Sequence, residues 1–281
     1  MKKDITLLHI AVFLFGLSGL FGKLISSPAE IIVSGRVISA TIFIYIVLKI
    51  KKEKIELFSP ESLKIIGVQG TLLFLHWFSF FQSIKLSTVA LGLLSFSTFP
   101  VFTTFMEPLF LRLPLDKKKV VIALITLMGV AVVAPIGNMD SHMTRGILLG
   151  FFSGFSFALL AVINKKLSVA TSGIKLTFYQ CFGASLCSIP VLLSNISTLP
   201  SGRELGLLIS LGVIFTGIAH ALFVSSLRSV SASTVSVTTC LEPVYGIAFA
   251  AVILGEIPTM KIFLGCSLIL MAAFSSARIE E

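Results

Sequence analysis

The sequence has 281 residues, of which 56% are hydrophobic and only 12% charged, whereas roughly a quarter of the residues in a soluble domain are charged. This balance excludes a soluble globular protein, because too few charged side chains are present to cover its surface. The formal net charge of +9 does not indicate nucleic-acid binding, since the lysines lie in short connections without a recognised binding motif. We therefore expect an integral membrane protein embedded in the lipid bilayer.

In chain order, apolar stretches near the roughly 20 residues needed to cross a bilayer predict an all-α membrane protein with ten transmembrane helices. Met1-Lys2-Lys3 and the apolar residues after it are interpreted as the first helix rather than a signal peptide, because no small-residue cleavage site follows. The expected helices cover residues 5–25, 30–50, 63–84, 86–107, 119–137, 146–165, 173–193, 204–226, 231–254 and 258–277.

The lysines and arginines are distributed unevenly between the two ends of these helices. Sixteen fall on the side that holds the N-terminus, the connections 49–64, 112–119 and 165–175, Arg228 and Arg278, and six fall at or near the opposite side. Positively charged residues are retained on the cytoplasmic side of a membrane. Both termini are therefore predicted to be cytoplasmic.

A constant offset of 143 residues relates the two halves of the chain. It pairs Lys85 with Arg228, Pro100 with Pro243, and neighbouring residues in the same order. We expect two five-helix repeats, residues 1–137 and 146–281, within one membrane unit. Because five is an odd number, the second repeat must enter the membrane in the opposite sense, as in many secondary transporters.

The expected ninth helix contains a carboxylate, Glu242, about 16 Å from its start at the helical rise. Charged residues at this depth usually face a bundle interior or a cavity. Glu242 could carry a proton, pair with an amine, or accept hydrogen bonds between helices. The adjacent Pro243 and its counterpart Pro100 are candidate flex points. At three-, four- and seven-residue spacing, one polar helical face would contain Ser231, Thr234, Thr238, Glu242 and Tyr245.

Histidines in the third and eighth expected helices are further candidates. His76 precedes Trp77 and lies near the same helical face as Ser79, while the 143-residue offset maps Trp77 onto His220. We expect His76 and His220 to approach each other across a central cavity, where either could carry a proton, because histidine changes charge near neutral pH. The alternative is that they are hydrogen-bonded within the bundle.

Arg36 lies about 9 Å below the outer end of the second expected helix. It could bind a substrate carboxylate, or it could pair with Glu30 or with backbone carbonyls. Glu107 is expected to be structural, since it lies near a cytoplasmic helix end from which its side chain can extend to the interface. Lys23 is expected to be an interfacial anchor, and the run 117–119 a solvated topology signal.

Motifs for cofactors and metals are absent from the sequence. We find no phosphate-binding G-x-x-x-x-G-K-[ST] loop and no metal-ligand or nucleophile motif, so no cofactor and no metal site are expected. Four cysteines lie inside apolar stretches without a C-x-x-C pair and are interpreted as small buried hydrophobic side chains. They are Cys181, Cys187, Cys240 and Cys266.

Several short stretches resemble the EamA family of the drug/metabolite transporter superfamily. Phe15-Gly16 followed by Lys23 is similar to its first-helix W-G…K pattern, with Phe in place of Trp. Ser226-Leu227-Arg228 resembles a hairpin-closing motif, and the segment from Leu241-Glu242-Pro243-Val244 to Leu254-Gly255-Glu256 resembles the ninth-helix signature. The resemblance implies ten helices in two inverted halves, with a cavity lined by spans 1, 3, 4, 6, 8 and 9.

The resemblance also implies a secondary active transporter rather than an enzyme. Such a transporter moves a small organic metabolite, such as an amino acid or a related compound, by alternating access. We expect a monomer or homodimer in a bacterial cytoplasmic membrane. Expected substrate-binding residues are His76, Trp77, Ser79, His220, Thr238, Glu242, Tyr245 and Arg36, of which Glu242, His220 and His76 are the candidates for proton coupling. The alternatives are a membrane-embedded enzyme and a passive channel for a small solute.

Overall fold

Helices dominate this protein because a backbone N–H or C=O group in a bilayer has no water partner and must be satisfied within its own segment. The computed structural model describes residues 2–133, 141–194 and 200–277, and all regular elements within them are helical, which confirms the all-α expectation. The α-helices are α1 (Lys2–Ser18), α2 (Phe21–Leu24), α3 (Ala29–Ile50), α4 (Pro60–Lys64), α5 (Gly70–Leu86), α6 (Val89–Phe96), α7 (Phe99–Leu111), α8 (Lys117–Val133), α9 (Ser141–Leu167), α10 (Gly173–Ser194), α11 (Gly202–Gly212), α12 (Ala219–Ser226), α13 (Ala232–Thr239), α14 (Glu242–Leu254) and α15 (Met260–Ala277).

Eight helical stretches within the described residues are long and apolar enough to cross a membrane. They correspond to eight of the ten expected helices and are Lys3–Leu24, Ala29–Ile50, Pro60–Leu86, Val89–Leu111, Ser141–Leu167, Gly173–Ser194, Gly202–Ser226 and Ala232–Leu254. The expected helices 119–137 and 258–277 correspond to the shorter α8 and to α15, whose apolar part is Met260–Ala272. Residues 134–137 and Arg278 lie outside the described residues, so the count of ten stays a prediction.

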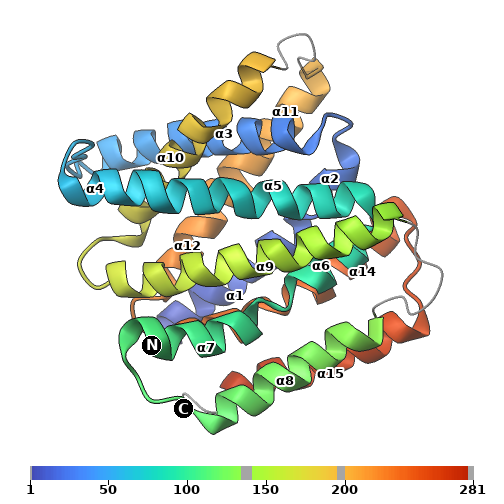
Figure 1. The fold of residues 1–281 in the computed structure, drawn as a ribbon. Helices are drawn as coiled ribbons and strands as arrows, with labels where there is room; N and C mark the ends of the chain where they lie inside the picture. The colour runs from blue at the N-terminus through green and yellow to red at the C-terminus, as the bar shows by residue number, and fades with distance from the viewer. Residues whose placement is uncertain (1, 134–140, 195–199, 278–281) are drawn as a thin grey trace.

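The spans pack into one bundle in which α5 packs against α9 and α10, and α1 packs against α12 and α14 (Figure 1). The pair α8 and α15 lies at one edge of the bundle, at the bottom of Figure 1. Small residues allow the closest approaches. A Cβ atom added to Gly70 would lie 2.5 Å from the Cα atom of Gly183, so α5 and α10 touch backbone to backbone there.

Two of the spans are broken near their centres. The first consists of α6 and α7, the second of α13 and α14, and each bound of the second pair lies 143 residues after its counterpart. Pro100 and Pro243 occupy the first turn of α7 and α14, where a missing N–H removes no helical hydrogen bond. The two breaks touch, since the Cys240 thiol donates to the Ser97 carbonyl at 3.6 Å.

This break corrects the expectation of one continuous polar face from Ser231 to Tyr245. α13 ends at Thr239 and α14 begins at Glu242. The spacing argument fails because it assumes one uninterrupted helix. Glu242 therefore lies at a helix N-terminus within the bundle.

The structure contains two further irregularities that the sequence interpretation did not predict. Short π-helical segments, η1 (Ile65–Gln69) and η2 (Val213–Ile218), interrupt the spans that contain α5 and α12. Such segments often occur at functional sites. In this protein they contain two buried polar residues, Gln69 and Thr216.

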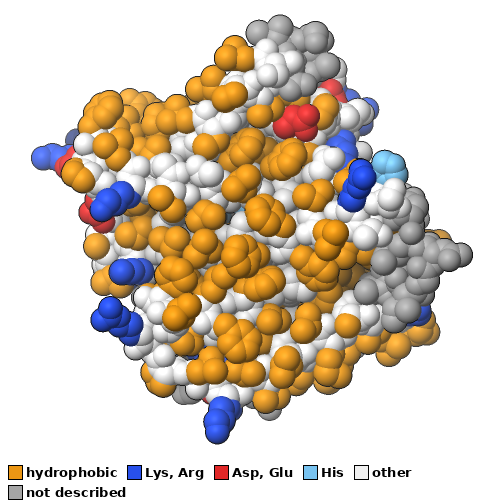
Figure 2. Space-filling view, in the orientation of Figure 1, with side chains coloured by type: hydrophobic (Ala, Val, Ile, Leu, Met, Phe, Trp, Pro, Cys, Tyr) orange, Lys and Arg blue, Asp and Glu red, His pale blue; other side chains and the backbone are white. Residues whose placement is uncertain are grey.

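The outer surface of the bundle is largely apolar. In the view of Figure 2, hydrophobic side chains cover most of the face, and Lys and Arg side chains lie around its margins. Exposed hydrophobic residues include Ile42, Leu109 and Val252. A soluble protein rarely exposes so large an apolar area, so this surface fits contact with lipid.

Candidate functional site

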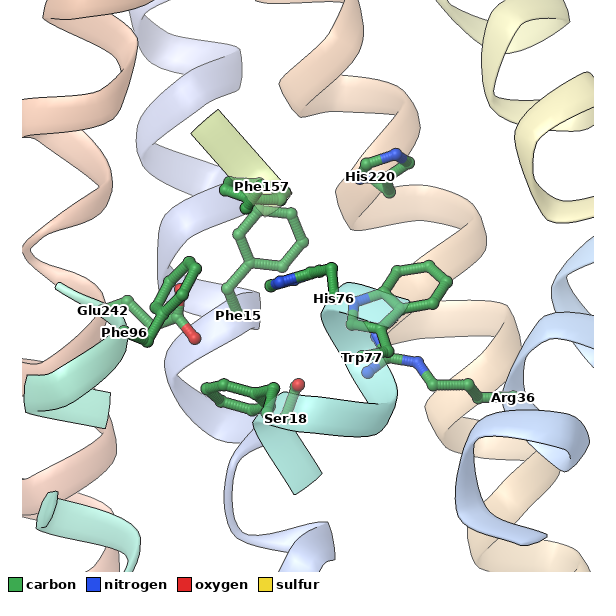
Figure 3. Close-up of a pocket in the computed structure, with 10 residues that line it drawn as sticks. Phe15, Ser18, Arg36, His76, Trp77, Phe96, Phe157, His220 and Glu242 are labelled. Carbon is green, nitrogen blue, oxygen red and sulfur yellow. The ribbon is translucent and has the colours of Figure 1, made fainter. Parts of the chain in front are cut away.

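Side chains from seven helices meet at a small cavity in the centre of the bundle (Figure 3). Its volume is about 20 Å³, which is space for about one water molecule. The site is therefore closed in this structure. It is lined by Phe15 and Ser18 of α1, Arg36 of α3, His76, Trp77 and Phe80 of α5, Phe96 of α6, Phe157 of α9, His220 of α12 and Glu242 of α14.

Glu242 lines this cavity from the first turn of α14 and is only 5% exposed. Among the described residues, none donates a hydrogen bond to its carboxylate. The N-terminal end of a helix carries a partial positive charge that favours a nearby anion. The carboxylate thus has a favourable local field and retains its capacity to accept a proton or bind an amine.

Arg36 enters the same cavity from α3 and is 1% exposed. Its Nε donates to the Thr216 hydroxyl at 2.9 Å and its Nη2 to the Phe215 carbonyl at 3.5 Å. The guanidinium carbon lies 3.9 Å from the centre of the Trp77 ring, which is a favourable cation–π distance. Two structural partners were expected for Arg36, namely Glu30 and a backbone carbonyl. The structure shows the bond to a backbone carbonyl, and no salt bridge to Glu30 occurs among the described residues.

One guanidinium nitrogen of Arg36, Nη1, remains unused. It is buried and has no hydrogen-bond partner among the residues that the structure describes. A buried charged group with a free donor is costly, and a carboxylate is the acceptor that a guanidinium binds best. Arg36 is thus equipped to bind an anionic group of a solute.

His76 lies beside Trp77 in Figure 3 and contacts the aromatic residues around it. Its Nδ1 lies 3.2 Å from the Ser153 carbonyl and 2.8 Å from the Ser153 hydroxyl. The ring centres of His76 and Phe157 are 4.5 Å apart. With Nδ1 held by Ser153, Nε2 is the nitrogen available to a ligand.

His220 lines the cavity from α12, next to Trp77 of α5. Its ring centre lies 5.7 Å from that of Trp77, edge to face, and it stacks on Phe223 at 5.9 Å. Its Nε2 is 2.9 Å from the Gln180 side-chain oxygen. Both histidines therefore line one cavity, and both are also hydrogen-bonded within the bundle.

Three expected site residues do not line the cavity. Ser79 donates its hydroxyl to the carbonyls of Leu75 and His76, and Thr238 donates to the Thr234 carbonyl. Tyr245 packs edge to face against Phe13 with ring centres 5.4 Å apart. In the first two cases, the hydroxyl bonds back to its own helix.

The sequence interpretation missed most of the aromatic lining. Phe80, Phe96 and Phe157 form edge-to-face pairs around His76. Among 25 phenylalanines, no sequence signal separates cavity residues from residues that face lipid. Gln180 was also missed, although an amide inside the apolar stretch 173–193 could have drawn attention to it.

Glu107 has a structural role that differs from the expected one. It is 3% exposed and does not extend to the interface. Its carboxylate accepts the Ala232 N–H at 2.6 Å, the Ser233 N–H at 3.0 Å and the Ser233 hydroxyl. Glu107 thus caps the N-terminus of α13 from a neighbouring helix, in addition to the local N-cap Ser231, whose hydroxyl accepts the Thr234 N–H at 3.2 Å.

The expected surface lysines also have specific contacts. Lys23 donates to the Ser87 carbonyl at 2.7 Å, and Lys119 donates to the Ser231 hydroxyl at 3.0 Å. Lys117 and Lys118 are exposed, in agreement with a solvated segment. Lys119 is therefore an exception within its run.

Comparison with known proteins assigns this architecture to a family. A model of the EamA-like transporter family matches residues 2–134 and 144–278. A protein of known crystal structure has the same fold, with a TM-score of 0.78 at 17% sequence identity over 99% of this chain and 98% of that chain.

Curated relatives carry transporter names. The chain is 26% identical to "Uncharacterized transporter YxxF" of Bacillus subtilis over 92% of this chain and 85% of that protein. It is 23% identical to "Pseudopaline exporter CntI" of Pseudomonas aeruginosa over 100% of this chain and 98% of that protein. It is 27% identical to "S-adenosylmethionine uptake transporter" of Rickettsia felis, over 73% of this chain and 68% of that protein.

Proposed function

Because this chain belongs to the EamA-like transporter family, and is thus a multi-pass transporter of a small solute in a bacterial cytoplasmic membrane, we propose that its solute is an amino acid or a related compound. Alternating access is the proposed mechanism. The solute would bind in the central cavity of Figure 3, between Arg36 and Glu242.

The charge pattern of the cavity carries this proposal. Arg36, a cation with an unused nitrogen, and Glu242, a carboxylate that accepts no hydrogen bond from the described residues, line the same closed space. A solute with one carboxylate and one amine would satisfy both groups. The aromatic residues around them would contact its apolar part, as is usual for small-molecule sites.

Alternating access requires the closed cavity to open. The proposed moving units are two inverted five-helix repeats, residues 1–137 and 146–281, which together give ten spans and cytoplasmic termini. The two separate matches to the family model and the equal positions of the two helix breaks support this division. Pro100 and Pro243, one at each break, are the proposed flex points.

The direction of transport is left to measurement. One relative is named as an exporter and another as an uptake transporter, so membership in the family does not fix the direction. Glu242, His220 and His76 are the proposed groups for proton coupling. We further propose that the protein is not an enzyme and works as a monomer or homodimer.

Flux measurements in proteoliposomes test this function. Uptake of a mixture of tritiated standard amino acids should saturate and show counterflow, whereas a channel would give no counterflow and an enzyme would change the solute chemically. If no component of the mixture is transported, the proposed substrate class is wrong.

The orientation has an independent test. Tags after Lys64 and at the C-terminus should be accessible from the cytoplasm, and a tag near Ser141 only from outside, because retained positive charge sets the orientation. Cytoplasmic labelling at Ser141 would overturn the inverted arrangement.

A further inference from the structure

A second polar cluster lies beside the central cavity and is not part of its lining. It consists of Gln69, Asn164 and Gln180, which come from η1, α9 and α10, and it contacts the cavity through His220. Their side chains are 1%, 0% and 0% exposed, respectively. We call this group of three the amide cluster.

Gln180 lies at the centre of the amide cluster. Its Nε2 donates to the side-chain oxygens of both Gln69 and Asn164, and its Oε1 lies 2.9 Å from the Nε2 atom of His220. The polar atoms of Gln180 are therefore all engaged within the cluster or with His220. The close contact of Gly70 with Gly183 places α5 and α10 near enough for these bonds.

The other two amides are not fully satisfied. The nitrogen atoms Gln69 Nε2 and Asn164 Nδ2 are buried and have no hydrogen-bond partner in the described part of the chain. Turning all three amides over would preserve the bonds to Gln180 but would leave the oxygens of Gln69 and Asn164 without partners instead. In either orientation, each of these two amides retains an unpartnered polar atom, which is costly in a protein interior.

The cluster lies toward one end of the bundle. Asn164 is three residues from the end of α9 at Leu167, and Gln180 is seven residues after the start of α10 at Gly173. The connection between these helices is on the proposed cytoplasmic side. A solute that leaves the central cavity toward the cytoplasm would therefore pass His220 and then the amide cluster.

We propose that Gln69, Asn164 and Gln180 form a second, uncharged subsite that binds the hydrogen-bonding head group of the solute between the central cavity and the cytoplasm. This inference rests on the proposed function of the central cavity. Amides can present a donor or an acceptor, so they can bind a carboxylate or an amine. Because they are neutral, they hold a charged group less strongly than Arg36 or Glu242, and conduction requires sites that also release the solute.

The test separates binding in the central cavity from passage through the subsite. The protein has one tryptophan, Trp77, which lines the cavity, so its fluorescence reports binding there. The double variant Gln69→Leu/Asn164→Leu should change the midpoint of amino-acid-induced fluorescence by less than about twofold and lower the exchange rate at least about tenfold. Gln82→Leu, the same substitution farther along α5, is the matched control and should alter neither.

Wild-type exchange in the folded double variant would overturn the proposal. An equal loss of binding and exchange would also overturn it, because the cluster would then act on the central cavity itself. Rescue by Gln69→Asn/Asn164→Gln, which restores both amides, would exclude a simple packing effect.

A second measurement needs no solute and remains decisive if the leucine variant does not fold. In a cysteine-free background, Asn164→Cys should react with a small charged methanethiosulfonate reagent added from the cytoplasmic side. A cysteine at this position that is inert from both sides would overturn the subsite. If Asn164→Cys reacts while no amino acid is bound or transported by the wild type, the substrate class proposed above is wrong and the subsite stands.

Discussion

Glu107 and Glu242 are both carboxylates buried within membrane spans, at 3% and 5% exposure, and they differ in what surrounds them. Glu107 accepts three hydrogen bonds from the start of α13. Glu242 begins α14, lines the central cavity and accepts none from the described residues. Burial of a charge therefore does not identify a functional residue in this bundle; an unfilled hydrogen-bonding capacity next to a cavity is more informative.

The two broken spans sharpen this comparison because their backbones correspond residue by residue. At the position of Glu242 the first span has Phe99, and at the position of Glu107 the second span has Ala250. Each span thus contains one buried carboxylate at a place where the other has an apolar residue. We infer that equal backbone geometry serves two purposes, a helix cap in one span and a solute contact in the other.

The largest effect is expected from Glu242→Gln. The amide is nearly isosteric but neutral, so the cavity loses its negative charge and its proton-accepting group. Amino-acid exchange in proteoliposomes should fall by about two orders of magnitude, and any residual exchange should lose its dependence on pH between about 5.5 and 8.5. The thermal midpoint should remain near that of the wild type.

Glu256→Gln is the matched control for this variant, because Glu256 follows α14 and lies outside the central cavity. If Glu242→Gln exchanges like the wild type with the same pH profile, Glu242 is a packing residue. The proposed site would then move toward His76 and His220.

Glu107→Ala should affect stability rather than transport. It removes the acceptor for two backbone N–H groups and one hydroxyl, which should cost about 2–4 kcal/mol of unfolding free energy. Glu107→Gln retains one acceptor oxygen and should cost less. Thermal unfolding in detergent, followed by exchange per folded molecule, measures both quantities. A loss of exchange without a loss of stability would contradict the capping role.

Chemical accessibility should separate the same two positions by a smaller factor. In a cysteine-free background, Glu242→Cys should react with a small polar thiol reagent when the cavity opens, about tenfold faster than Glu107→Cys. The amino-acid mixture should protect position 242 only. Equal reactivity at both positions would show that the cavity does not distinguish them.

The smallest effect concerns the histidines. The ring centres of Trp77 and His220 lie 5.7 Å apart, so a change of charge on His220 should alter Trp77 fluorescence by tens of percent at most. His220→Gln should remove the pH dependence of the emission, and His76→Gln should preserve part of it. If neither substitution changes the fluorescence titration, these histidines do not take part in proton coupling.

The sequence by itself determined the class of protein, eight of its spans and its family. These properties depend on composition, on stretches long enough to cross a bilayer, and on local motifs such as the one around Glu242 and Pro243. The 143-residue offset also related His76 and Trp77 to His220, and all three line the central cavity. Such features are readable because bilayer thickness and helical geometry act on contiguous residues.

Only the tertiary structure decided which polar side chains already have hydrogen-bond partners within the protein. Ser79 and Thr238 bond to their own helices, whereas Glu107 caps a helix that begins 125 residues later. The contacts of Gln180 are likewise set by neighbouring spans. A hydrogen bond between distant segments depends on how the helices approach one another, and spacing along the chain contains no direct record of that.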